Sequence, residues 1–96
     1  MTLPRVDKPW LDHVRGLRCC LTGVRYGVVP HHVRLAGTCG IGLKPPDALT
    51  VPMNRREHQR IHTEGTTTAE DALIYERLCF LLIEYIGQRF TGGEGF

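Results

Sequence analysis

The sequence lacks an apolar run of about 20 residues, the length that a transmembrane helix needs, so we expect no membrane span. Its first residues lead into no apolar signal-peptide core, which favours a cytoplasmic protein. In that compartment the four cysteines are expected to be thiols or metal ligands rather than disulfides. These cysteines are Cys19, Cys20, Cys39 and Cys79.

Acidic residues are scarce in one part of the chain. Between His13 and His62, eight Arg or Lys accompany only two acids, whereas residues 63–96 carry two Arg and six acids. The formal net charge of +2 conceals this asymmetry. A basic segment suits a phosphate backbone, although a solvated basic face is the more common explanation of such a charge pattern taken alone.

Histidines are concentrated in the same basic segment. Four of the five lie between Val29 and His62, as a His31-His32 pair and as the His58-x-x-x-His62 motif. A chain of 96 residues fits one small domain, so these histidines belong to a single core. The stretch from 29 to 62 is therefore the part of the chain from which a function can be inferred.

The first part of the chain is expected to be mostly extended or irregular. Residues 1–17 form an N-terminal arm, of which residues 1–12 are expected to be irregular. Trp10 and Leu11 are expected to anchor this arm to the core, and stacking of Trp10 on a base is the alternative. The run 28–34 is rich in β-branched residues and predicts a strand, in which Pro30 favours an edge or a bend. Residues 35–50 contain three glycines and two prolines and predict a long loop.

Two helices are expected after the loop. Pro52 is a favourable first-turn residue, and a helix over about 55–63 is expected to end near Gly65. A longer helix over 66–90 starts at a capping box, either Thr67 with Glu70 or Thr68 with Asp71, and residues 91–96 form a flexible tail. The apolar surface of this last helix is too broad for one stripe, so it is expected to bind a second copy or another protein as well.

The histidine pattern predicts a metal site with a separate base. His58 and His62 lie one turn apart on the expected helix, with Cβ atoms about 6 Å apart, which suits two imidazoles on one ion. Consecutive strand residues point to opposite faces, so His31 and His32 cannot do the same work. Hydrolysis of a phosphodiester needs a base near neutral pH and positive charge beside the phosphate, and this segment offers both.

These motifs resemble the HNH endonucleases of the ββα-metal (His-Me finger) fold, and within them the phage recombination nucleases related to Ref. The resemblance covers about residues 18–64. Its pieces are His31-His32-Val33-Arg34, a Gly-rich loop ending in Lys44-Pro45-Pro46-Asp47, Val51-Pro52, and His58-Gln59-Arg60-Ile61-His62. The combination is specific, whereas His-x-x-x-His alone is weak.

The resemblance implies a fold and residue roles. The fold is α+β, with a small ββα-metal core over 18–65 and an added C-terminal helix over 66–90. His32 is implied as the general base, and Asp47 as a residue that ties the loop to the strand backbone and orients His32. His31, His58 and His62 are implied as the ligands of one divalent metal ion, Mg²⁺ or Mn²⁺, with Zn²⁺ or Ni²⁺ as alternatives.

The resemblance further implies DNA as the substrate and partner. The basic residues expected to hold its backbone are Arg34, Lys44, Arg55, Arg56 and Arg60. One departure concerns a second, structural zinc of many relatives. Asn54 and Glu57 stand where one of its Cys-x-x-Cys pairs falls, and Cys20 with Gly23 is all that is left of the other. We therefore expect no zinc knuckle and expect the C-terminal helix to brace the site.

Two other functions fit the residues. A zinc on His31, His58, His62 and a cysteine such as Cys39 would make a non-catalytic nucleic-acid-binding module. A regulatory module would act through the apolar C-terminal helix. A closed four-ligand site favours binding alone, and an open site with water favours catalysis.

Overall fold

The computed structural model describes residues 3–35 and 44–91. The chain forms helix α1 (Lys8–Arg15), strands β1 (Val28–His32) and β2 (Thr50–Asn54), helix α2 (Arg55–Glu64) and helix α3 (Thr68–Ile86). A π-helical turn, Gly87–Thr91, follows α3. Helices and an antiparallel strand pair make this an α+β domain, as expected for the class. No helix in the described part of the chain is long and apolar enough to span a membrane.

The expectation of an irregular N-terminal arm is wrong, because residues 8–15 form α1. Asp7 caps this helix by accepting a hydrogen bond from the Trp10 N–H at 3.2 Å. Trp10 and Val14 are then buried, which agrees with the packing role expected for Trp10. The arm is thus part of the core rather than an appendage to it.

The two strands form an antiparallel pair in which Pro30 lies opposite Pro52 and His31 opposite Val51. Hydrogen bonds from Arg55 N–H to Gly27 O and from Val33 N–H to Leu49 O flank this pair. Because antiparallel pairs alternate, the two prolines fall at a non-hydrogen-bonded position and remove no ladder bond. Pro52 is therefore a strand residue, and the expectation that it starts the helix is wrong.

Helix α2 begins at Arg55 because Asn54 caps it. The Asn54 side chain accepts a hydrogen bond from the Arg56 N–H at 3.0 Å. Gly65 ends the helix with a φ of 79°, a conformation that favours glycine. The observed helix is one residue longer than the span expected from the sequence.

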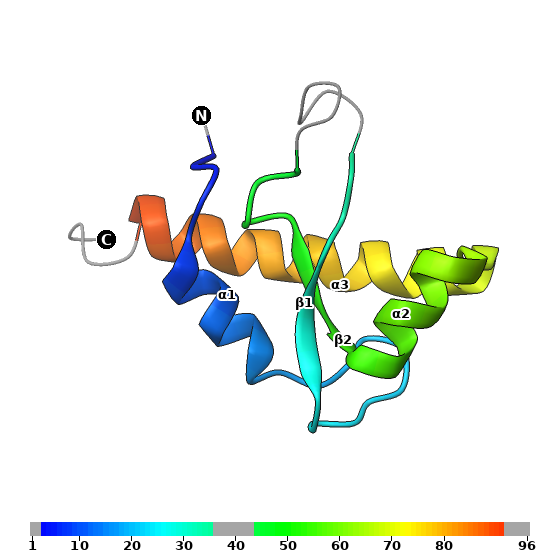
Figure 1. Ribbon diagram of the computed structural model, residues 1–96. Helices are drawn as coiled ribbons and strands as arrows, with labels where there is room; N and C mark the ends of the chain where they lie inside the picture. The colour runs from blue at the N-terminus through cyan, green and yellow to red at the C-terminus, as the bar shows by residue number, and fades with distance from the viewer. Residues whose placement is uncertain (1–2, 36–43, 92–96) are drawn as a thin grey trace.

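Helix α3 begins with the capping box between Thr67 and Glu70, one of the two expected from the sequence. It ends at Ile86, before the expected residue 90. Figure 1 shows α3 running behind the strand pair, with α1 and α2 on opposite sides of the strands. Leu73, Phe80 and Ile83 of α3 are exposed by 46–69%.

The core lies between the strands and α3. One cluster joins β2 and segments outside the two strands to two residues of α3; its buried members are Cys19, Val33, Leu49, Val51, Met53, Ile74 and Leu78. A second cluster joins α1 to the end of α3; its buried members are Trp10, Val14, Ala48, Leu81 and Tyr85. Helix α3 belongs to both clusters, so it holds the strand pair and α1 in place.

Candidate metal centre and adjoining base

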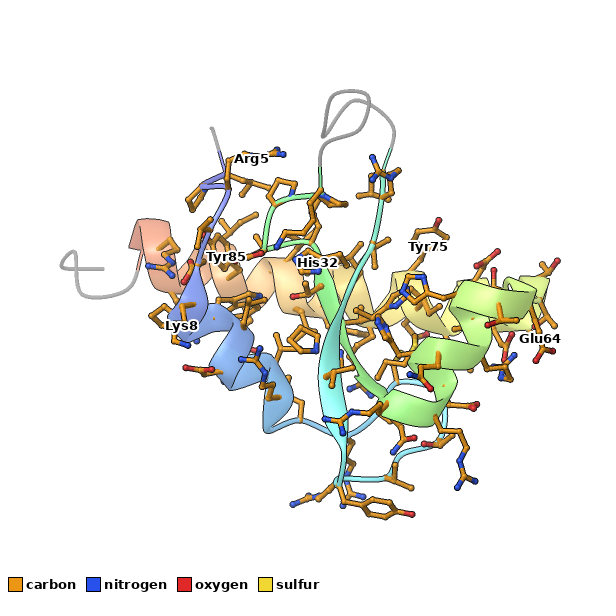
Figure 2. All side chains as sticks on the ribbon, viewed as in Figure 1. Arg5, Lys8, His32, Glu64, Tyr75 and Tyr85 are labelled. Carbon is orange, nitrogen blue, oxygen red and sulfur yellow. The ribbon has the colours of Figure 1, made fainter. Side chains whose placement is uncertain are left out.

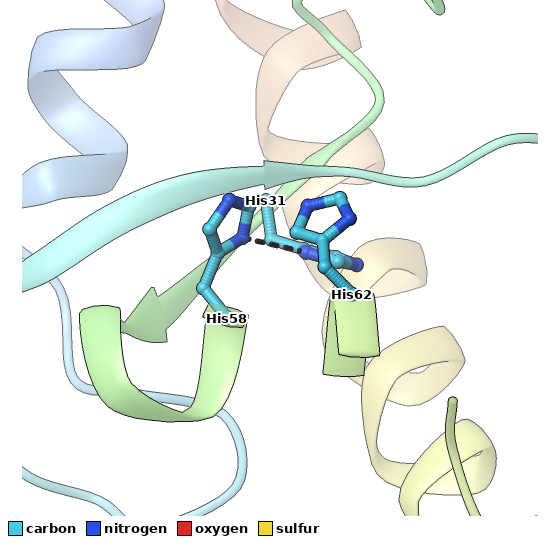
Figure 3. A group of neighbouring side chains, drawn as sticks. All are labelled: His31, His58 and His62. Atoms are coloured by element: carbon cyan, nitrogen blue, oxygen red, sulfur yellow. Dashed lines mark hydrogen bonds between the residues drawn. The ribbon is translucent and has the colours of Figure 1, made fainter. Parts of the chain in front are cut away.

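Three histidines from two elements meet beside β1. His58 and His62 lie one turn apart on α2, and His31 reaches them from the facing side of the strand (Figure 3). The Nδ1 atoms of His31 and His58 are 3.0 Å apart. One ring nitrogen from each of the three lies within 4.8 Å of the others. The structure therefore brings together the three histidines that the sequence assigned to a metal.

This donor set fits a divalent ion. Nitrogen ligands at 2.0–2.1 Å from an ion are roughly 3–4 Å apart, depending on the angle between them. The His31–His58 separation of 3.0 Å already meets that requirement. His62 is exposed, so its ring has room for the shift of less than about 1 Å that the longest separation requires.

The environment favours the neutral form of His31 and His58. Burial, and after it the neighbouring His58, His62 and His32, together lower the pKa of His31 to about 4. Burial and the neighbouring His62 and His32 also lower the pKa of His58. A neutral imidazole has a free lone pair, which is the form that binds a metal.

His32 points to the other face of β1 and forms a pair with Asp47. Its Nε2 atom is 2.9 Å from the Asp47 Oδ1. Because a carboxylate accepts, Nε2 carries the proton and the lone pair is on Nδ1. A His–carboxylate pair of this kind fixes one tautomer and supports proton abstraction by the ring.

Asp47 is itself buried, with 1% of its surface exposed. Burial alone would raise its pKa, but the Asp7 N–H, His32 and Lys44 together hold the pKa below its ordinary value. The Asp7 N–H donates to Asp47 Oδ2 at 2.8 Å, and Thr50 Oγ1 donates to the Asp47 carbonyl at 2.9 Å. Asp47 is therefore ionised and fixed, as an orienting group must be.

The sequence did not predict the hydrogen-bond network that reaches Asp47 through Asp7. The Asp7 carboxylate accepts from the Tyr85 hydroxyl at 3.0 Å and from the Arg89 guanidinium. Figure 2 labels Tyr85 and His32, which contact Asp7 and Asp47 respectively. The spacing of Asp7 two residues before Pro9 is a helix N-cap signal that could have identified Asp7. Its contacts with Asp47 and Tyr85 span 40 and 78 residues, and no local pattern predicts those.

The role expected for Asp47 therefore needs a correction. Its side chain does contact His32, but it ties His32 to the backbone of the segment preceding α1 rather than to the strand backbone. The physical reason is that α1 packs against the strands and presents the Asp7 N–H to the carboxylate.

The histidines and two basic residues line a common hollow of about 410 Å³. Its lining includes His31, His32, His58 and His62, together with Arg34, Lys44 and two prolines. Side chains from both faces of β1, those of His31 and His32, therefore border the same hollow at the end of the strand. A phosphate in this hollow would lie beside both the three-histidine cluster and the His32–Asp47 pair.

The basic residues of α2 differ in their surroundings. Arg55 and Arg56 are exposed at the start of the helix. Arg60 instead pairs with Glu57 at 3.4 Å and with Glu70 of α3. Two carboxylates offset its charge, so Arg60 is a bridge between α2 and α3 and contributes less positive potential than expected.

Cys39 and the glycines at 40 and 42 lie outside the described residues.

Comparison with models of protein families gives a match. A family model described as "Protein of unknown function (DUF968)" matches residues 4–72, which include α1, both strands, α2 and the first turn of α3. No curated protein and no solved structure matches the chain.

Proposed function

The chain belongs to the DUF968 family, whose description gives no function, and from its own residues we propose that it is a metal-dependent endonuclease of the HNH type. The observation that carries this proposal is the common hollow. A potential three-ligand metal cluster and a histidine–carboxylate pair open into the same space. DNA is proposed as the substrate because the motifs resemble those of the HNH endonucleases.

The order of elements supports the ββα-metal assignment. An antiparallel strand pair is followed directly by a helix, and the first strand and the helix supply the histidines. Residues 18–65 would be this nuclease core. Helix α1 and helix α3 would then be additions that hold Asp47 and the strands in place.

Each residue of the hollow has a chemical task in this proposal. A divalent ion on His31, His58 and His62 would supply positive charge next to the scissile phosphate and the leaving oxygen. His32 takes a proton from the attacking water at Nδ1, because Asp47 holds its Nε2–H. Arg34 and Lys44, on the rim, attract and position the phosphate backbone.

The same geometry favours catalysis over a purely structural metal. A structural zinc is enclosed by four protein ligands, whereas catalytic sites keep a position open. Within residues 3–35 and 44–91 the cluster contains three ligands, and it opens onto the hollow. A binding module with a fourth ligand is the alternative.

The test is cleavage of supercoiled plasmid with and without Mg²⁺ or Mn²⁺. We expect nicking or linearisation that depends on the metal, and we expect His32→Ala to reduce its rate by about 10²-fold to 10⁴-fold. His13→Ala is the matched control, because His13 lies on α1, where it pairs with Glu84 at 2.8 Å outside the hollow. Equal cleavage by His32→Ala and the wild type would refute the base assignment.

A second measurement separates the enzyme from the binding module. Calorimetric titration of the chelator-treated protein with Mn²⁺ should give one site, lost in His58→Ala and retained in His32→Ala. Zinc that binds tightly, together with an absence of cleavage under any metal, would favour the module.

We also propose that the exposed side of α3 carries a protein contact, either a second copy or another protein. Its apolar residues Leu73, Phe80 and Ile83 lie on the outer surface, away from the two core clusters. A single metal site cuts one strand at each engagement, so two copies would allow cleavage of both strands. Sedimentation of the purified protein over a range of concentrations tests this association.

A further inference from the structure

A second basic site lies away from the histidine hollow. Three arginines, Arg18, Arg25 and Arg77, line a separate hollow of about 310 Å³ together with Gly16 and Leu17. Two of them come from the segment between α1 and β1, which Figure 1 shows in light blue, and the third comes from α3. In the sequence, Arg18 and Arg25 belong to the basic segment between His13 and His62, and Arg77 had no predicted role.

The fold brings these arginines together by a closed turn. The Cys19 N–H donates to the Val24 carbonyl at 2.8 Å, and the Gly23 N–H donates to the Cys19 carbonyl at 2.9 Å. Gly23 has a φ of 78°, which this turn needs and which glycine adopts without strain. Because residues 19 and 24 are held together, the flanking Arg18 and Arg25 lie next to each other.

Hydrogen bonds orient two of the three guanidinium groups, which keep free donors. Arg18 Nη1 donates to the Gly23 carbonyl and Arg77 Nη1 donates to the Arg18 carbonyl, both at 3.3 Å. A guanidinium has five N–H donors in a rigid fork, so most remain available for an oxygen anion. None of the ion pairs formed within the described ranges involves Arg18, Arg25 or Arg77, so their charges are not offset by a carboxylate.

One feature opposes an anion here. The C-terminal end of α1, at Gly16, borders the hollow and carries a partial charge of about −0.5. The three full positive charges of Arg18, Arg25 and Arg77 exceed this partial charge. The hollow is therefore a positively charged site with rigid donors.

We propose that Arg18, Arg25 and Arg77 bind a phosphate of the nucleic-acid backbone that flanks the cleavage site. The ligand class rests on the proposed nuclease function. The hollow lies near the start of β1, whereas His32 is at its end, and the five-residue strand spans about 13 Å. The bound phosphate is therefore expected about 13 Å or more from the one that is cut.

The test is the salt dependence of duplex binding. Anisotropy of a labelled duplex of about 20 base pairs is measured in chelator, so that binding is separated from cleavage. For Arg25→Ala we expect the magnitude of the slope of log K against log salt to decrease by up to about 0.9, which is the value of one lost phosphate contact. The Arg25→Ala, Arg77→Ala double variant should come closer to the full loss of about 0.9, because both arginines contact the same phosphate, and circular dichroism verifies that each variant is folded.

Arg15→Ala is the matched control. It removes the same formal charge from an exposed arginine, which pairs with Asp12 at 2.7 Å. We expect it to leave the slope unchanged. A slope for Arg25→Ala equal to that of the wild type, or an equal loss in Arg15→Ala, would overturn the proposal. Calorimetry with inorganic phosphate adds a second arm, in which tighter binding of free phosphate than of the duplex would also overturn it.

The two proposals fail in different ways. If plasmid is not cut under any metal but duplex binding still depends on Arg25, the nuclease function fails and the second site stands. If plasmid is cut while the salt slope is the same in Arg25→Ala and the wild type, the second site fails and the nuclease function stands.

Discussion

The most direct physical consequence of the three-histidine cluster is a loss of stability in mild acid, traceable to His31. Its pKa is lowered from 6.5 to about 4 in the folded protein, chiefly by burial and then by the neighbouring histidines. The unfolded chain therefore takes up the proton more readily than the folded one. The contribution of neutral His31 to the free energy of unfolding is complete above the unfolded pKa of 6.5. It is lost as the pH falls from 6.5 toward 4.

The size of the effect follows from the two pKa values. Linkage gives a loss of about 2 kcal/mol between pH 7.5 and pH 5, and about 3 kcal/mol once the pH is below 4. For a domain of this size, 2 kcal/mol lowers the melting temperature by about 8–16 °C. A loss of that size is a large part of the stability of a small domain.

The assay is urea denaturation of the metal-free protein across this pH range. The variant His31→Gln has no titrating group at this position, so its free energy of unfolding should fall by about 2 kcal/mol less than that of the wild type. His13→Gln, outside the cluster, should retain the wild-type loss. Parallel curves for the wild type and His31→Gln, within about 0.5 kcal/mol, would refute the argument that burial keeps His31 neutral.

Three further predictions concern the supports of the site. Asp47→Asn should lower the plasmid cleavage rate by about a hundredfold or more, because His32 loses its charged partner, and an unchanged rate would remove Asp47 from the mechanism. Tyr85→Phe should cost about 1 kcal/mol in urea denaturation, since it removes a hydrogen bond to the buried Asp7 carboxylate; no cost would mean that the hydroxyl bond is without net effect. Thr67→Ala should cost about 1 kcal/mol in thermal unfolding through loss of the helix cap, and an equal melting temperature would contradict this.

Local patterns predicted the parts of the site that lie within one element. The i,i+4 spacing of His58 and His62 places both rings on one side of α2, because the helix period fixes it. The alternation of a strand likewise separates His31 from His32. These geometric rules hold whenever the element itself forms.

Contacts between distant segments could not be predicted in this way. Asp7 supports Asp47 from 40 residues away, and the sequence around either residue contains nothing that specifies the partner. Arg60 looked like a free basic residue because its second carboxylate, on Glu70, belongs to the next helix. Pro52 gave a helix signal that the strand register overrode, because a proline costs nothing at a non-hydrogen-bonded position.

That register in turn explains why one strand can hold both chemical groups. A shift of β1 by one residue would exchange the faces of His31 and His32, moving His32 toward α2 and His31 toward Asp47. It would also move Pro30 to a hydrogen-bonded position, where its missing N–H would break the ladder. The opposed pair Pro30 and Pro52 therefore disfavours the shifted register. Two residues without any polar side-chain group thus help to fix which histidine faces α2 and which faces Asp47.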